Sequence, residues 1–426
     1  MELRSDGAPD RLESLRPEVA AVLEDGLGRL RALGVDGAGS GDSDGAGARD
    51  GARARDGAGA HDGADEGSFD PRPAEALAAA GLQRLVVPLA RGGLGASLRE
   101  TALVLAALGA VDGSAALGLA MHSQILGGAL QAAAGSWPLP LLREVLEAAL
   151  GDDGWIGSAA AEERAGSPQR GARLDTTAEL QPQGTYRIEG AKAWVTWLPT
   201  LRYLLVSARL GEGTGIFLLE RGTPGLEGDG RFDALSLRAS GSGHLRLDGV
   251  EAPAERLVSC REAHSADPRG PAPQAWFGLA VAATYLGIGE GARAAVAAFA
   301  RERRPADAPR GIGALPIVAA RLGRLDATLR VARLVTLETA RRWDAAASDA
   351  TARAALLGEV ALAKLTATNA AVSATEEALR IAGGPGLSQG PLERAFRDAR
   401  AGLIHPPLDD ISYQSFARRL LEAPQD

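Results

Sequence analysis

Two residues near the middle of the chain have a spacing suited to a flat ligand. Trp194 and Thr196 fall in a segment that is typical of a β-strand. Residues i and i+2 of a strand lie on one face, so this indole and this hydroxyl would both address one planar molecule. Most Trp-x-Thr triplets simply pack in a core. The pair therefore predicts ligand contact only together with other motifs.

Other residues with usable chemistry lie in the C-terminal third. The adjacent Gly383 and Gly384 would let backbone N–H groups reach phosphate oxygens with no Cβ in the way. Phe299 and Arg303 are spaced i, i+4 and so share a helical face. His405 carries an imidazole, which serves near neutral pH as a general base or a hydrogen-bond partner. A helix-end Gly pair, a solvated Arg and a His beside two prolines are the structural alternatives.

Composition bounds the class of protein. The chain has 426 residues and a formal net charge of −8, which argues against nucleic acid as the main partner. Cys260 is the single cysteine, so we expect no disulfide framework and no Cys-based metal site. No basic, apolar signal peptide and no long apolar run are seen, so we expect a cytoplasmic protein that does not cross a membrane.

The periodicity of apolar residues changes twice along the chain. Helical spacing predicts helices over 12–33, 74–80, 98–108, 115–134, 280–300, 317–343, 352–381 and 391–400. Asp112, with Ser114, is expected to provide the N-cap of the helix over 115–134. Short apolar runs between turns predict strands over 155–160, 186–188, 194–196, 203–209, 215–220 and 244–247. This order excludes a doubly wound α/β fold, in which strands and helices alternate.

Five segments follow from these patterns. The interior of 35–69 lacks large apolar side chains and is expected to be a disordered low-complexity insertion. We expect an N-terminal helical segment (1–34), this insertion (35–69), a helical domain (70–150), a β domain (151–258) and a helical bundle (272–426).

Four stretches resemble signatures of the acyl-CoA dehydrogenase superfamily. Residues 81–123 look like its first signature, and 189–196, EGAKAWVT, match its N-G-x-K-x-W-I-T pattern. Residues 381–386 and 391–400 match a Gly-Gly turn followed by P-x-E-R-x-x-R-D. The resemblance implies an α+β fold, with an N-terminal helical domain, a central β-barrel-like domain and a C-terminal four-helix bundle.

The same resemblance implies FAD, bound between the β domain and the bundle of a dimer or tetramer. Trp194 would cover one flavin face and Thr196 would bond the ring near N5. Arg303, Gly383 and Gly384 would reach the diphosphate of the neighbouring subunit's FAD. The family's T-E-P-G-A-G-S-D signature aligns here with AEERAGSP and loses its first hydroxyl. Flavin contacts are expected from Ser158, Ala161 and Ser167.

The chain departs from the family at the catalytic base. Pro406 occupies the usual catalytic Glu position, and Phe277 occupies the alternative position on the first bundle helix. Neither side chain accepts a proton. His405, next to the missing Glu, is the expected catalytic residue.

The superfamily's flavin monooxygenase branch tends to carry a His at the place of His405. It often carries a second His on an N-terminal helix, where this chain has His122. Asp409 and Asp410 are further candidates for the base.

Three functions follow from this resemblance. The first is oxidation of a small-molecule acyl thioester, carried by CoA or a carrier protein, with hydride transfer to flavin N5 and a relocated base. The second is a two-component monooxygenase that uses reduced flavin, oxygen and His405. The third is a non-catalytic assembly partner, against which the retained Trp194, Thr196, Gly383 and Gly384 argue. Neither a flavin reductase nor an electron acceptor is identified by the sequence.

Overall fold

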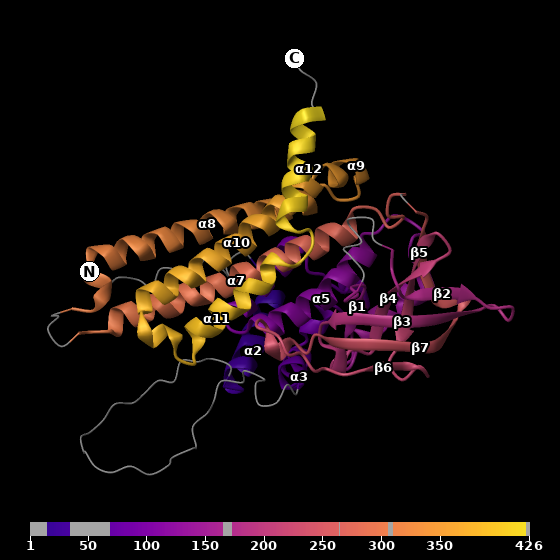
Figure 1. Ribbon diagram of the computed structural model, residues 1–426, viewed down its shortest axis with the longest axis horizontal. Coiled ribbons are helices and arrows are strands. Elements are labelled where there is room, and N and C mark those ends of the chain that lie inside the picture. The colour runs from indigo at the N-terminus through magenta and orange to yellow at the C-terminus, as the bar shows by residue number, and fades with distance from the viewer. Residues whose placement is uncertain (1–14, 35–68, 165–172, 264, 306–309, 423–426) are drawn as a thin grey trace, which may run out of the picture.

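The computed structural model describes residues 15–34, 69–164, 173–263, 265–305 and 310–422. Helices, then a sheet, then helices follow one another along these residues, as the periodicity predicts. Figure 1 shows the long C-terminal helices on one side and the sheet on the other, with α5 between them. The junction between bundle and sheet is therefore the natural place for a site.

The N-terminal helices begin at side chains that cap them. Ser97 accepts a hydrogen bond from the Glu100 N–H, and Asp112 accepts one from the Ala115 N–H, which confirms Asp112 as an N-cap. The helices are α2 (Pro17–Ala32), α3 (Arg72–Ala79), α4 (Leu98–Gly109), α5 (Gly113–Leu130) and α6 (Leu139–Ala148). The periodicity did not predict α6.

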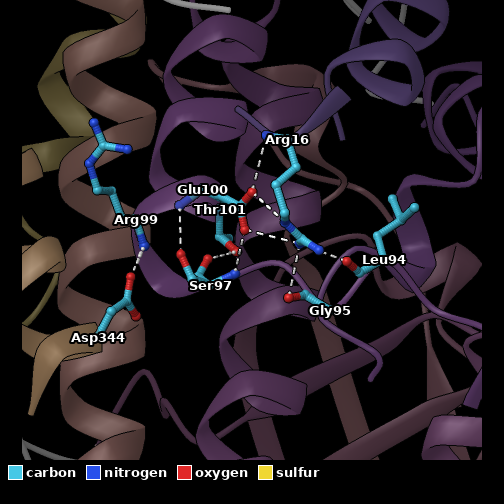
Figure 2. A network of polar contacts seen from close by, with 8 residues as sticks. All are labelled: Arg16, Leu94, Gly95, Ser97, Arg99, Glu100, Thr101 and Asp344. Atoms are coloured by element: carbon cyan, nitrogen blue, oxygen red, sulfur yellow. Dashed lines mark hydrogen bonds and ion pairs between the residues drawn. The ribbon is translucent and has the colours of Figure 1, made fainter. Parts of the chain in front are cut away.

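A polar network ties α2 to the start of α4 (Figure 2). The Arg16 Nε and Nη2 donate to the Glu100 carboxylate at 2.8 and 3.0 Å, and Nη2 also donates to the Leu94 and Gly95 carbonyls. From the bundle, the Asp344 carboxylate accepts the Leu98 and Arg99 N–H groups at 3.0 Å. Three segments remote in sequence thus meet at one helix N-terminus.

We expect Glu100→Ala to lower the free energy of unfolding by about 1–3 kcal/mol. The substitution removes the acceptor of the half-buried Arg16 contacts and one half of the capping box at Ser97. Glu75→Ala, at an exposed first-turn position of α3, is the matched control and should change stability by less than about 0.5 kcal/mol. Urea unfolding of the two variants makes the comparison. Equal stabilities would show that this network holds nothing together.

The central domain is one sheet of eight strands. Its strands are β1 (Ile156–Ala159), β2 (Thr177–Leu180), β3 (Thr185–Val195), β4 (Tyr203–Leu210), β5 (Gly213–Glu220), β6 (Leu226–Gly228), β7 (Gly243–Pro253) and β8 (Leu257–Arg261). Their order is β6-β7-β3-β2-β4-β5-β8, and β1 pairs in parallel with β4. The sequence missed β2, β6 and β8, which are short and carry few large apolar side chains.

The C-terminal domain is a bundle in which the long helices α7, α8 and α10 run side by side (Figure 1). Its helices are α7 (Ala272–Glu302), α8 (Pro316–Ala345), α9 (Ala350–Ala355), α10 (Leu357–Ala382), α11 (Pro391–Ala399) and α12 (Asp409–Glu422). The single helix predicted over 352–381 is divided at Leu356 into α9 and α10. Residues 350–382 have the length and apolar character of a membrane span, but 56% of the tested window is buried in the bundle.

Helix α5 is buried nearly all round because both layers pack on it. A Cβ on Gly118 would stand 1.9 Å from the Trp197 ring, and one on Gly127 would stand 2.4 Å from the Trp276 ring. Trp197 comes from the sheet and Trp276 from α7. The absence of a side chain at these two glycines therefore lets the two indoles pack directly against the α5 backbone.

Phe69 corrects the end of the predicted insertion. The sequence assigns it to 35–69, but its half-buried ring lies against Gly230 and Gly241 and packs on the core. The remainder of that insertion, 35–68, lies outside the described residues.

Candidate active site at the junction of sheet and bundle

Strand β3 ends in a bulge that presents Trp194. The register with β7 shifts between Lys192 and Val195, and Trp194 has φ 58°, in the left-handed region. Its indole is 52% exposed, whereas Thr196 is buried and its Oγ1 lies 3.1 Å from the Ser242 Oγ. The prediction that the two share a face through strand alternation is therefore wrong, because the bulge breaks the period of two.

The loop after β1 lies against the same bulge. The Ala161 carbonyl accepts the Ala193 N–H at 3.0 Å, so exposed Ala161 adjoins Trp194. Ser158 is half-buried on β1. Ser167, also expected to contact flavin, lies outside the described residues.

A buried ion pair fixes this loop. The Lys192 Nζ donates to the Glu162 Oε1 at 2.5 Å, and the side chains are 0% and 3% exposed. Glu162 also accepts the Asp175 and Thr176 N–H groups at 2.7 and 3.1 Å. Burial alone would raise the pKa of Glu162, but these hydrogen bonds outweigh it and hold that pKa below its ordinary value.

Residues 236–242 connect the bulge to the bundle. The Ser242 Oγ lies 2.7 Å from the Ser240 Oγ, and the Leu237 N–H donates to the Asp398 Oδ1 at 2.7 Å. Asp398 is on α11, and burial raises its pKa to about 7, although the Leu237 N–H and Arg394 oppose that rise. This hydrogen bond links the sheet domain to α11, the helix that precedes His405 in the chain.

His405 lies on two aromatic side chains of α7. Its ring centroid is 6.2 Å from that of Phe277 and 5.6 Å from that of Tyr285. Although part of the residue stays accessible, burial of the ring, with the charge of Lys364 second, lowers the pKa of His405 to about 4. The imidazole is therefore neutral at pH 7 and accepts a proton or a hydrogen bond.

Neither family position for a catalytic carboxylate holds one in this structure. Pro406 is exposed beside His405, and Phe277 packs under the His405 ring. At Gly278, the next residue after Phe277, a Cβ would already stand 2.6 Å from Val360. Positions 277 and 278 of α7 are therefore apolar, and His405 adds a proton acceptor against them.

His122 has a structural role, because both of its ring nitrogens bind backbone groups. Its Nε2 lies 2.6 Å from the Gln83 carbonyl, and its Nδ1 accepts the Ile156 N–H at 3.2 Å. These partners require the Nε2–H tautomer and occupy both ring nitrogens. Burial lowers its pKa to about 4. His122 thus joins the N-terminal domain to β1 and has no nitrogen left for a ligand.

The expected diphosphate residues lie elsewhere. Arg303 is exposed at the end of α7, and Gly383 and Gly384 are exposed at the end of α10. Figure 1 shows both helix ends at the end of the bundle remote from the sheet. Within one chain these residues do not meet Trp194. Their expected role toward the flavin of a neighbouring subunit stays a prediction.

Sequence reasoning missed two buried polar residues near His405. Tyr285 and Lys364 are fully buried, and neither the Tyr285 Oη nor the Lys364 Nζ has a hydrogen-bond partner among the described residues. The one feature of the sequence that could have indicated Lys364 is that it is a single lysine within the apolar helix α10. In the parts of the chain that the structure describes, no group of three His, Cys, Asp or Glu side chains could hold a metal.

The fold and site define a flavoprotein-type oxidoreductase, and comparisons with known proteins identify its family. Residues 279–409 match the acyl-CoA dehydrogenase C-terminal domain and residues 47–137 match the N-terminal domain. The putative acyl-CoA dehydrogenase YdbM of Bacillus subtilis is 32% identical over 84% of this chain and 92% of its own length. The chain belongs to the acyl-CoA dehydrogenase family.

The chain is also similar to a protein named for a different activity and to two solved structures. The amino sugar nitrososynthase DnmZ of Streptomyces peucetius is 32% identical over 79% of this chain and 83% of its own length. KijD3 in complex with dTDP superposes with a TM-score of 0.79 at 22% identity over 97% of this chain and 99% of that chain. Butyryl-CoA dehydrogenase of Megasphaera elsdenii superposes with a TM-score of 0.77 at 19% identity, over 99% of this chain and 100% of that chain. The two structures confirm the predicted fold class.

Proposed function

We propose that this protein is a flavin-dependent monooxygenase on the acyl-CoA dehydrogenase fold, supplied with reduced flavin by a separate reductase. One observation carries the proposal: both carboxylate positions are lost, while a neutral His405 lies on Phe277 and Tyr285 where the family's base would act. A thioester dehydrogenase must remove a proton at Cα, whereas an oxygenase needs no such carboxylate. DnmZ, 32% identical, is named for making a nitroso group on an amino sugar, which adds oxygen to nitrogen.

The residues present fit FAD as the cofactor. The exposed Trp194 indole beside Ala161 offers a flat apolar surface, and the hydroxyl of Thr196, two residues on, is held by Ser242. At the far end of the bundle, a Cβ built on Gly383 or Gly384 meets nothing within 4 Å, so this turn leaves room for a diphosphate. When bound, the flavin supplies two-electron redox chemistry and, once reduced, reacts with oxygen.

The side chains of the site would act by excluding water and accepting a proton. Phe277 and Tyr285 form an apolar wall, which limits water access to the reacting atoms. His405 keeps a neutral imidazole against this wall and would accept or return a proton at a ring nitrogen. Thr196 would orient the flavin edge through its hydroxyl.

Acyl-thioester oxidation remains a second candidate because a carboxylate lies nearby. The Asp409 Oδ1 has no hydrogen-bond partner among the described residues and lies 3.6 Å from the Lys364 Nζ. A base relocated to Asp409 would allow hydride transfer to flavin N5. YdbM, named a putative acyl-CoA dehydrogenase, supports this candidate.

Anaerobic mixing distinguishes the two functions. The protein is first loaded with FAD, and uptake is measured by absorbance and calorimetry. We then expect acyl-CoAs of several chain lengths to leave the flavin oxidised, because no side chain at position 406 or 277 removes the Cα proton. Bleaching of the flavin by any acyl-CoA would establish the dehydrogenase. Failure to take up flavin in either its oxidised or its reduced form would remove both candidates and favour the non-catalytic partner.

We further propose a homo-oligomer in the cytoplasm. On α8, the apolar side chains of Ile317, Val331 and Leu334 are more than half exposed, which suits a subunit interface. A second copy would also bring Gly383, Gly384 and Arg303 to the flavin of its neighbour. Light scattering should give a dimer or tetramer.

A further inference from the structure

A buried cation lies behind His405. Lys364, on α10, is 0% exposed, and its Nζ has no hydrogen-bond partner in the described part of the chain. The Asp409 Oδ1 is 3.6 Å away, which is an ion pair but too long for a hydrogen bond. A buried ammonium without hydrogen bonds costs stability, so this arrangement is unfavourable for the fold alone.

The counter-ion is held in a fixed position. The Asn369 Nδ2 donates to the Asp409 Oδ2 at 2.8 Å and to the Leu365 carbonyl at 2.9 Å. Asn369 and Lys364 are both on α10, and Asp409 begins α12. The carboxylate is therefore oriented with its second oxygen toward the ammonium.

The segment that precedes His405 packs closely on the helix that carries Lys364. A Cβ on Gly402 would stand 3.0 Å from both Thr368 and Tyr285, so the segment before His405 lies directly on α10 and α7. The Thr368 Oγ1 donates to the Lys364 carbonyl at 2.9 Å, one helical turn away. Gly402 thus allows the contact that brings His405 near the buried cation.

Charged and titratable groups reach this region from four elements. Tyr285 comes from α7, Lys364 from α10 and Asp409 from α12. Asp398 of α11 acts on Tyr285, whose pKa burial raises well above its ordinary value, so the phenol stays neutral. The ammonium is the charge that acts on the His405 ring.

We propose that Lys364 is a positioning residue for His405: its buried ammonium, held in place by Asp409, keeps the imidazole in its neutral, proton-accepting form. The inference rests on the proposed function for its catalytic meaning, but the electrostatic effect exists without it. A cation beside an imidazole disfavours imidazolium, and Asp409 limits that effect by neutralising the pair. Burial lowers the pKa of Lys364, whereas Asp409 raises it.

The test is an NMR titration of the full-length protein labelled at histidine. The His405 signal is assigned by its loss in His405→Gln. In the wild type we expect His405 to stay neutral between about pH 5 and pH 8. In Lys364→Met the midpoint should rise toward the range of an ordinary histidine, while Lys364→Arg should keep it low. An unmoved midpoint in Lys364→Met would overturn the proposal.

Asp409→Asn has a matched control in exposed Asp410→Asn on the same helix turn. We expect Asp409→Asn to lower the midpoint or leave it low, and Asp410→Asn to leave it unchanged. A midpoint raised equally by both would contradict a specific pair. The melting temperature of Lys364→Met should not fall, because Met fills the space without a charge; a large loss would assign Lys364 to stability instead.

Activity provides a separate readout. If the wild type shows turnover, the pH at which its activity falls on the acid side should be higher in Lys364→Met, in step with the NMR midpoint. A shifted midpoint without any flavin-dependent activity in the wild type would refute the proposed function and leave the electrostatic role of Lys364 standing.

Discussion

His405→Ala is expected to lower turnover by about 10²–10⁴-fold, the usual contribution of a general acid–base group, while FAD binding stays intact. The ring contacts Phe277 and Tyr285, and it is not among the residues expected to hold the flavin. Turnover is measured as oxygen consumed in excess of peroxide released with reduced flavin supplied. Flavin affinity is measured by calorimetry.

His405→Gln separates the two roles of the imidazole. Glutamine forms hydrogen bonds but does not accept a proton, so a base role predicts that this variant is as slow as His405→Ala. Recovery of most of the activity would assign a hydrogen-bonding role. Because the pKa of His405 is about 4, the neutral form persists at pH 7, and base-dependent activity should fall only on the acid side, near that value. Full activity of His405→Ala would place the base elsewhere, with Asp409 next.

Glu162→Gln should lower the free energy of unfolding by about 3–5 kcal/mol, because Lys192 would remain buried without its counter-ion. Urea unfolding followed by Trp fluorescence measures the loss. Glu163→Gln is the matched control: Glu163 is the next residue, exposed, and pairs with exposed His244. Its effect should stay below about 1 kcal/mol. Equal losses in the two variants would contradict a special role for the buried pair.

The pH dependence of the same pair has a defined sign. The pKa of Glu162 is held below its ordinary value of 4.5 in the folded state. Its contribution is therefore fully present above the unfolded pKa and is lost as pH falls through the folded pKa. Wild type should lose stability below about pH 4.5 more steeply than Glu162→Gln. The double variant Glu162→Leu with Lys192→Met should recover much of the loss, because no unpaired charge remains.

The order of elements was predictable because apolar periodicity is a local property. Asp112 was identified as an N-cap from its type and position, and the structure gives it that contact. The division of the last long prediction at Leu356 was not visible, since α9 and α10 have similar composition. Strands β2 and β6 are short and held mainly by pairing with β3 and β7, which sequence alone does not reveal.

The site was only partly predictable because its contacts join distant segments. Motif spacing singled out Trp194 and Thr196, but the bulge at φ 58° that separates their faces depends on pairing with β7. The sequence gives Lys364 no role, because its burial beside Asp409 arises only when α12 packs on α10. The roles of the expected flavin contacts remain predictions.

Reoxidation of the reduced, FAD-loaded protein tests the central claim most directly. Oxygen uptake and hydrogen peroxide release are followed together after mixing with oxygenated buffer, without substrate. The proposed monooxygenase predicts that peroxide release lags behind oxygen uptake in the wild type and that His405→Ala abolishes the lag. Peroxide that appears in step with oxygen uptake in both proteins would contradict it.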